Sequence, residues 1–250
     1  MKKELCCLLS SSILCACVAS DSSSKKVRIA QAIKKEGDAY QVQGKYTAAL
    51  AKLLEAEKII PKDPYLQNSL GLAYMGKKRY ALAVSSFTMA LKYKPDFTDA
   101  KNNLGVALLR QKKWDKAITR FMQVLEDLIY PTPHFALSNI GWAYLGKSQY
   151  ANAQTYFLKA LEVQGEFTTA IHGLAQVYIQ TRQTDRALKY LHRILKQTPD
   201  SMILHADLAQ VYEQKGQRNK ALEQWHLILG HVDANTALAR KAQDRILILE

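Results

Sequence analysis

The chain has little of several residue types on which small, fibrous or redox proteins depend. No cysteine follows Cys17 among the 250 residues, so the body has no disulfide, no cysteine-based zinc site and no cysteine nucleophile. Only 6 prolines and 11 glycines are present, which excludes a collagen-like or linker protein. Apolar residues make up 48% of the chain, too many for a wholly disordered protein and enough to build a core.

The cysteines that are present all lie in an N-terminal segment that begins basic and continues apolar. Lys2 and Lys3 precede an apolar stretch from Leu5 to Ala19, which is shorter than the ~20 residues of a membrane-spanning helix. A basic start, a short apolar stretch and small residues indicate a secretory signal. A buried N-terminal helix is the alternative, but the apolar residues lack helical periodicity. The four cysteines are Cys6, Cys7, Cys15 and Cys17.

The end of this segment, Leu14-Cys15-Ala16-Cys17, resembles a bacterial lipobox. It has an aliphatic residue three places before the last cysteine and a small residue immediately before it. The resemblance implies a signal peptide over 1–16, cleavage before Cys17 and diacylglycerol on its thiol. Acyl chains such as palmitate on this residue would anchor the protein stably, because each buried CH₂ contributes ~0.8 kcal/mol. No cofactor other than this covalent lipid is expected.

The residue after the lipobox cysteine bears on the cellular location of the protein. Val18 follows the cysteine, and the sorting rule known from enterobacteria then implies the outer membrane, with the protein anchored by its lipid on the periplasmic face. The resemblance therefore implies lipoprotein sorting machinery as one partner. The polar, serine-rich composition after Cys17 predicts a flexible tether over 17–29.

Glycine, alanine and aromatic residues recur along the body at a step of 34 residues, with a single step of 36 between the third and fourth copies. A small residue stands at Gly37, Gly71, Gly105, Gly141, Ala175 and Ala209. Twelve residues further on stand Ala49, Ala83, Ala117, Ala153, Ala187 and Ala221. Sixteen residues further on stand Leu53, Phe87, Phe121, Phe157, Leu191 and Trp225.

This pattern resembles the tetratricopeptide repeat, a helix–turn–helix unit of 34 residues. Six copies would cover 30–63, 64–97, 98–131, 134–167, 168–201 and 202–235. The resemblance implies an all-α, right-handed superhelical solenoid, with repeats 1–3 over 30–131 and repeats 4–6 over 132–235. Apolar and basic residues at helical spacing over 236–250 predict a C-terminal capping helix. The small residues at repeat positions 8 and 20 are expected where two helices cross closely, beside the large residue at position 24.

One motif matches a phosphate-binding loop letter for letter. Gly141 begins the pattern G-x-x-x-x-G-K-[ST], which continues to Gly146, Lys147 and Ser148. A phosphate-binding loop needs a strand before it and a helix after it, so that backbone N–H groups surround the phosphate. Here Gly141 falls at repeat position 8, inside an expected helix. We therefore expect no enzyme, although this loop is the one candidate for nucleotide chemistry.

The histidines and the net charge indicate no metal ion and no nucleic acid. None of the 6 histidines has metal-ligand spacing, since no H-x-x-x-H pair occurs. The formal net charge is +13, but the lysines and arginines are spread along the repeats without a long basic run. Solvated helix faces explain this distribution better than nucleic-acid binding. An acidic partner or an anionic surface stays open as an alternative.

In the tetratricopeptide family the first helix of each repeat lines a concave groove, and here repeats 2 to 4 place apolar, aromatic and asparagine side chains there. This mixture is suited to a peptide, because amides bond the peptide backbone while aromatic rings bury its side chains. The alternative is that some of these residues only pack between helices. The candidate groove residues are Tyr65, Asn68, Leu72, Met75, Asn102, Asn103, Val106, Leu109, Phe135, Asn139, Trp142 and Leu145.

Members of the family that bind chaperone tails hold a terminal carboxylate with a clamp of Asn, Asn, Lys and Arg. This chain carries other residues at those places, two of them acidic. The family resemblance therefore implies that carboxylate-tail binding is lost. The residues that replace the clamp are Asp38, Ser69, Asp99 and Asn103.

A lipid-anchored protein with six such repeats resembles the type IV pilus pilotins, lipoproteins that help the pilus secretin reach and assemble in the outer membrane. A Tyr130-Pro131 segment ahead of the fourth repeat is a further local likeness. The resemblance implies a non-enzymatic scaffold in type IV pilus biogenesis, with a secretin subunit or another periplasmic or outer-membrane protein as partner. A periplasmic adaptor lipoprotein that recruits a protease or a cell-wall enzyme is the alternative.

Overall fold

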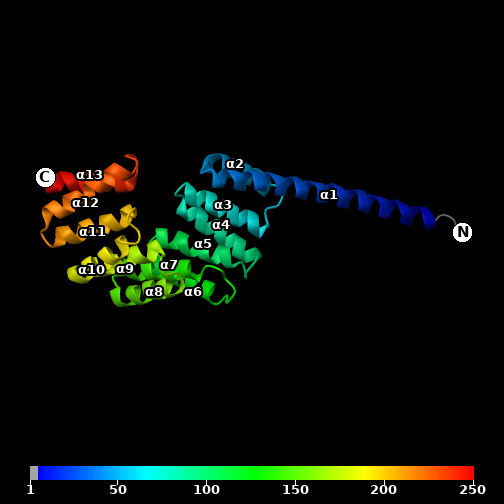
Figure 1. Cartoon of the computed structure of the whole chain (residues 1–250). Helices are drawn as coiled ribbons and strands as arrows, with labels where there is room; N and C mark the ends of the chain where they lie inside the picture. Colours follow the sequence, from blue (N-terminus) through cyan, green and yellow to red (C-terminus); the bar gives the residue numbers. More distant parts are fainter. Residues whose placement is uncertain (1–4) are drawn as a thin grey trace. The chain divides into compact units, whose positions relative to one another are not determined.

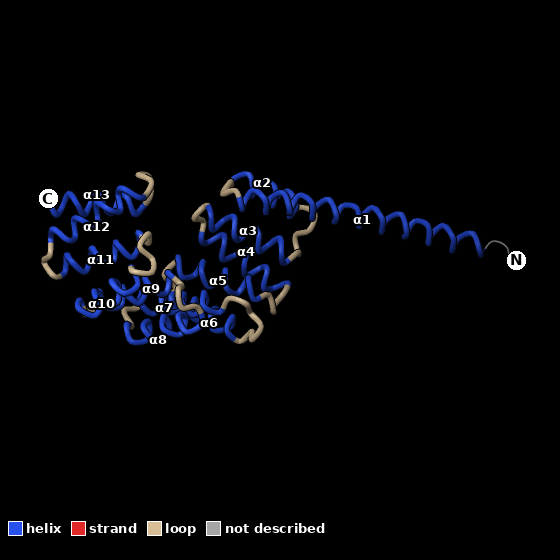
Figure 2. The backbone as a smooth tube through the Cα atoms, in the orientation of Figure 1, coloured by secondary structure: helices blue, strands red, loops and turns tan. Residues whose placement is uncertain are grey.

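The computed structural model describes residues 5–250, and side chains from residue 24 onward; this part of the chain contains helices and no strand (Figures 1 and 2). The chain divides into two compact units, the first ending at Leu128 and the second beginning at Ile129. The helices are α1 (Leu5–Val42), α2 (Tyr46–Glu57), α3 (Pro64–Gly76), α4 (Tyr80–Tyr93), α5 (Thr98–Arg110), α6 (Trp114–Leu125), α7 (Pro133–Gly146), α8 (Tyr150–Val163), α9 (Thr168–Gln180), α10 (Thr184–Leu195), α11 (Met202–Gln214), α12 (Arg218–His231) and α13 (Ala237–Leu249).

Each unit is a row of helix pairs. In the first unit α1 packs on α2, α3 on α4 and α5 on α6, and α1, α3 and α5 also contact one another in order. In the second unit α7 packs on α8 and α11 on α12, while α9 contacts both α7 and α11. The first helices of successive repeats therefore form a continuous face within each unit. The predicted fold class, an all-helical array of helix–turn–helix repeats, is confirmed, and α13 follows the sixth repeat where the sequence predicts a terminal helix.

The contact between repeat positions 8 and 24 explains the 34-residue pattern. A Cβ atom added at Gly71 would lie 2.4 Å from the Phe87 ring, and one added at Gly105 would lie 2.6 Å from the Phe121 ring. The three phenylalanine and two leucine side chains at position 24 are fully buried, as is Trp225. Glycine or alanine is needed at position 8 because the large residue sixteen places later occupies the space that a longer side chain would fill.

All six turns within repeats have the same backbone conformation at repeat position 15. The φ angle there is positive, which glycine adopts at little cost and other residues do not. The positions are Gly44 (71°), Lys78 (58°), Lys112 (59°), Ser148 (57°), Arg182 (55°) and Gly216 (70°). Four of the six repeats therefore have a residue other than glycine in a left-handed conformation, which the sequence pattern does not predict.

The N-terminal helix α1 begins well before the first repeat, at Leu5. The range 17–29, for which the composition predicts a flexible tether, is helical, because neither proline nor glycine lies between residues 5 and 36 to end the helix. The predicted signal peptide over 1–16 and the side chain of Cys17 lie outside the described side chains, so the lipid anchor stays a prediction. Among the described residues, none of the helices combines the length and apolar character that crossing a bilayer requires.

The contact between positions 8 and 24 can be tested by introducing into repeat 3 the residue pair found in repeat 5. Gly105→Ala should lower the free energy of unfolding by about 1–2 kcal/mol, since overpacking against Phe121 outweighs the better helix propensity of alanine. Adding Phe121→Leu reproduces the Ala175–Leu191 pair of repeat 5 and should recover part of the loss. Urea denaturation of the two single variants and the double variant measures the coupling. Strictly additive losses would contradict the packing account.

Candidate functional site

The candidate groove residues of the first unit share one face of α3 and α5. Asn103 Nδ2 on α5 donates to Asn68 Oδ1 on α3 at 3.0 Å, so the amides of neighbouring repeats bond side by side on this face. Leu72 is 38% exposed and therefore available to a ligand. The others on these two helices are half-buried: Met75, Asn102, Val106 and Leu109. The structure thus brings the first-unit residues of the prediction together.

Tyr65, at the start of α3, is exposed but held in place. Its hydroxyl accepts a hydrogen bond from Lys94 Nζ at 2.7 Å, and its ring lies 5.1 Å from the Phe97 ring. The bond to Tyr65 raises the pKa of the Lys94 amine above its ordinary value. With 49% of its surface exposed, Tyr65 offers a ring of fixed orientation at one edge of the groove face.

The remaining candidate groove residues, Phe135, Asn139, Trp142 and Leu145, lie on α7 in the second unit. Phe135 is 45% exposed and meets Phe167 edge to face, with ring centroids 5.0 Å apart. Trp142 packs edge to face on Phe157 at 5.4 Å and lies 5.1 Å from the His172 ring. Both aromatic side chains therefore contribute to packing between repeats as well as to the surface.

The sequence reasoning missed a polar cluster that continues this face in repeats 5 and 6. Asp207 on α11 is fully buried, and its two carboxylate oxygens bond to His172 Nδ1 and Gln176 Nε2 of α9, each at 2.7 Å. Burial raises the pKa of Asp207 above its ordinary value, although the bonds to His172 and Gln176 act in the opposite direction. A buried acid held by neutral donors and a histidine is a costly arrangement for a structural core.

The repeat register could have revealed this cluster. Asn68 and Asn103 stand at repeat positions 5 and 6 of successive repeats, 35 residues apart, and His172 and Asp207 stand at the same two positions and the same separation. Gln176 stands at position 9, where repeat 2 has Leu72. Extending the candidate groove positions from repeats 2–4 to repeats 5 and 6 would have included all three residues.

The turn that resembles a phosphate-binding loop has no free backbone donors. Gly141 lies inside α7, where an added Cβ would be 2.7 Å from Phe157. The N–H groups of Lys147, Ser148 and Gln149 donate to carbonyl groups of the last turn of α7, so they end the helix. The same turn occurs in the other five repeats, which explains the motif as a product of the repeat.

The other sequence candidates also have structural partners. Of the residues that replace the carboxylate clamp, Asp38 accepts from Lys34 Nζ at 2.7 Å, Asn103 bonds to Asn68, and Ser69 is buried. The described residues include no group of three histidine, cysteine, aspartate or glutamate side chains arranged to hold a metal ion.

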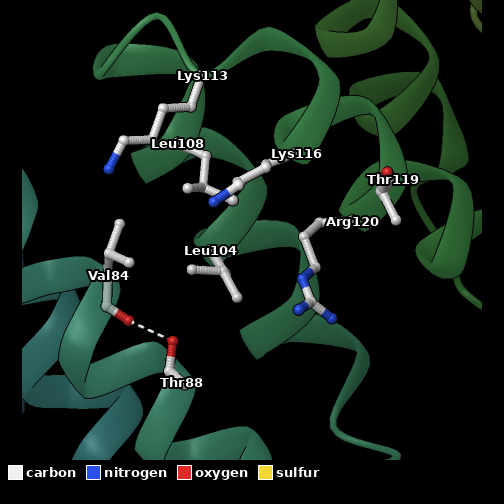
Figure 3. Close-up of a pocket in the computed structure, with 8 residues that line it drawn as sticks. All are labelled: Val84, Thr88, Leu104, Leu108, Lys113, Lys116, Thr119 and Arg120. Carbon is white, nitrogen blue, oxygen red and sulfur yellow. Dashed lines mark hydrogen bonds between the residues drawn. The ribbon is translucent and has the colours of Figure 1, made fainter.

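Positive charge gathers at a pocket of about 380 Å³ beside the second helices of the first unit (Figure 3). Lys113, Lys116 and Arg120 line it together with apolar residues of α4 and α5. Arg120 Nη1 donates to Gln123 Oε1 at 2.9 Å, so part of this guanidinium is already bonded. The pocket lacks aromatic residues, and its lining comes from residues other than the candidate groove residues.

Comparison with protein families identifies the repeats. Models described as tetratricopeptide or TPR repeats match residues 37–78, 68–128 and 144–204, which together span parts of all six predicted copies. No curated protein sequence matches the chain.

Solved structures share the fold at low sequence identity. PilW, whose structure is described as that of a widely conserved type IV pilus biogenesis factor, has a TM-score of 0.75 and 22% identity; 86% of this chain and 98% of PilW are covered. PilF of Pseudomonas aeruginosa has a TM-score of 0.67 and 20% identity, with 88% and 99% covered. A tetratricopeptide repeat protein of Parabacteroides merdae has a TM-score of 0.72 and 19% identity, with 88% and 86% covered.

The buried acid makes a prediction about pH. The folded-state pKa of Asp207 is raised above the unfolded value of about 3.8. The protonated carboxyl group therefore contributes its full stability below that pH, and this contribution is lost as pH rises through the folded pKa and the buried group ionises. Asp207→Asn keeps an acceptor for Gln176 and removes the buried charge. We expect it to raise the free energy of unfolding at pH 7.5 by about 1.4 kcal/mol per unit of raised pKa, and to give no gain below pH 3.8.

Urea denaturation of both proteins across this range measures the effect. Asp233→Asn is the matched control, because it removes the same charge from an exposed position. An equal gain for Asp207→Asn at both ends of the range would contradict the proposed charge effect.

Proposed function

This chain is a tetratricopeptide-repeat protein, and from that premise we propose that it is a lipid-anchored outer-membrane scaffold that binds a secretin subunit during type IV pilus biogenesis. The observation that carries the protein-binding part is the face of first helices, where exposed Leu72 and Tyr65 lie beside the Asn68–Asn103 amide pair. Apolar anchors next to fixed amides are suited to an extended or helical peptide.

The pilus part of the proposal rests on two independent likenesses. The fold is shared with PilW, a type IV pilus biogenesis factor, over nearly the full length of that protein. The sequence Leu14-Cys15-Ala16-Cys17 supports a lipid anchor at Cys17, which would hold the scaffold at the membrane where a secretin assembles. Because the sequence identity to PilW is only 22%, the likeness shows a shared fold, and the secretin partner is our proposal.

The mechanism that we propose requires binding and co-localisation, with no bond chemistry. Sorting machinery would recognise the lipid on Cys17 and deliver the protein to the outer membrane. The face of first helices would hold a segment of a secretin subunit, so that delivery of the scaffold concentrates secretin subunits at the site of ring assembly. Groups available for this in the first unit are the exposed Leu72 and the amides of α3 and α5.

An adaptor lipoprotein that recruits a periplasmic protease or cell-wall enzyme uses the same kind of surface. The two functions differ in what is retained after crosslinking. A tagged full-length chain isolated from membranes should retain a secretin in the first case and a hydrolase in the second. The fold shared with PilW favours the first.

Deletion of the gene tests the pilotin proposal directly. Heat-resistant secretin multimers in the outer membrane should be reduced, because subunits would no longer be concentrated there. Immunoblotting of membrane fractions from the deletion strain measures them, and a strain complemented with Cys17→Ser should remain defective if the lipid is needed. Normal multimers in the deletion strain would exclude the proposal.

The groove face itself is tested by two leucines of the same repeat. Leu72→Asn, on α3, should weaken secretin binding about tenfold or more, because it removes an exposed apolar anchor. Leu82→Asn is the matched control, since Leu82 is 50% exposed and lies on the second helix α4. Trp142→Ala with Leu109→Ala extends the test to the other candidate positions. Binding that is lost equally with Leu72→Asn and Leu82→Asn would place the partner elsewhere.

A further inference from the structure

We propose that a basic pocket on α10 is a second binding site, which takes an acidic segment of a partner protein. The pocket encloses about 510 Å³ in the second unit. None of its lining residues is a candidate groove residue, so the inference does not depend on the proposed secretin site. The α10 pocket, as we name it, is lined by Tyr178, Arg186, Lys189, Tyr190, His192, Arg193 and Lys196.

The cations of the α10 pocket are not neutralised by the protein. Arg186, Lys189, Arg193 and Lys196 recur at helical spacing, so they follow one side of α10 and its end. In the part of the chain that the structure describes, no carboxylate pairs with any of them, and the one acid of α10, Asp185, is bound to Lys215 at 2.6 Å. The pocket therefore keeps a local excess of positive charge that favours an anionic ligand.

Aromatic rings fix the guanidinium groups of this pocket. Arg186 Cζ lies 5.2 Å from the centre of the Tyr178 ring, and Arg193 Cζ lies 5.7 Å from the centre of the Tyr190 ring. The two rings meet edge to face at 5.9 Å. A guanidinium held over a ring keeps N–H groups at its edge for a carboxylate, and its restricted motion lowers the entropy lost on binding.

Repeat 4 of the same unit shows that the fold does not require these charges. It has the corresponding tyrosine pair, Tyr144 and Tyr156, stacked at 5.5 Å, with Lys159 over the Tyr156 ring. Where repeat 5 has Arg186, Lys189 and Lys196, repeat 4 has Asn152, Thr155 and Glu162. The tyrosine pair belongs to the packing of both repeats, whereas the cluster of cations distinguishes repeat 5 and needs a separate explanation.

The geometry of the α10 pocket favours a peptide over a bilayer. The cations surround a concave space that contains two tyrosine rings, and a flat lipid surface would contact only its rim. Carboxylate side chains match the paired N–H groups of arginine, and the half-buried Tyr190 ring offers apolar surface to an aromatic residue of the peptide. His192 is already engaged, since its Nε2 lies 3.1 Å from the Tyr212 hydroxyl, so we assign it no contact with the ligand.

Transferring repeat 4 residues into repeat 5 tests the proposal. The probe is a fluorescein-labelled synthetic peptide with four glutamates around one phenylalanine, titrated with the purified full chain and followed by fluorescence anisotropy. Arg186→Asn with Lys189→Thr should weaken binding at least about tenfold, because two charged contacts are lost. Lys58→Asn with Lys62→Thr removes the same charge from exposed positions of the first unit and should change affinity less than twofold.

Two further arms separate the outcomes. Circular dichroism of each variant establishes that it is folded. The unmodified chain, which should bind the glutamate peptide, should not bind a control peptide in which every glutamate is replaced by glutamine. Vesicles of phosphatidylcholine with phosphatidylglycerol are titrated in parallel. Equal peptide affinity for the two double variants would overturn the proposal. So would binding to the anionic vesicles alone, lost with Arg186→Asn and Lys189→Thr, since the pocket would then be a lipid site.

Discussion

The contact between a small residue at repeat position 8 and a large one at position 24 is the constraint on which the rest of the structure depends. Each first helix approaches its second helix closely enough that the Phe87, Phe121 and Phe157 rings fill the space beside a glycine. This closeness sets the pairing of helices, and the pairing leaves one side of every first helix for the next repeat or for a ligand. The residues of the candidate groove and of the α10 pocket lie at other repeat positions, so they are not used in this contact.

Much of the fold could be predicted because this packing requires particular residue sizes at fixed separations. A small residue sixteen places before a large apolar one is visible in a sequence, and so the six repeat ranges follow from it. The left-handed turns at Lys78, Lys112 and Arg182 could not be found in this way, since lysine and arginine carry no sign of a positive φ angle. There the hydrogen bonds that end the helix impose a conformation against the residue's own preference.

The candidate site was predictable only where its residue types looked typical of peptide binding. Asparagines and aromatics of repeats 2–4 satisfied that expectation, whereas His172 and Asp207 lie in repeats 5 and 6, outside the predicted groove. Whether a polar side chain is buried depends on its neighbour in the next repeat, 35 residues away, and no local pattern contains that information. The same reasoning applies to α10, where the spacing of the cations is visible but their lack of carboxylate partners is a property of the folded chain.

The side-chain bonds between successive repeats have a consequence for how such a protein can change. The contact between positions 8 and 24 lies within a repeat, so exchanging or duplicating whole repeats would keep it. Phe157 of repeat 4 also packs closely on Gly173 of repeat 5, and this second contact would be lost. The bonds of His172 with Asp207 and of Asn68 with Asn103 join particular neighbours. If the sixth repeat were moved next to another, Asp207 would lose its histidine and remain as an isolated buried acid. The order of the repeats is thus encoded in the polar residues of this face, while their architecture is encoded in the apolar core.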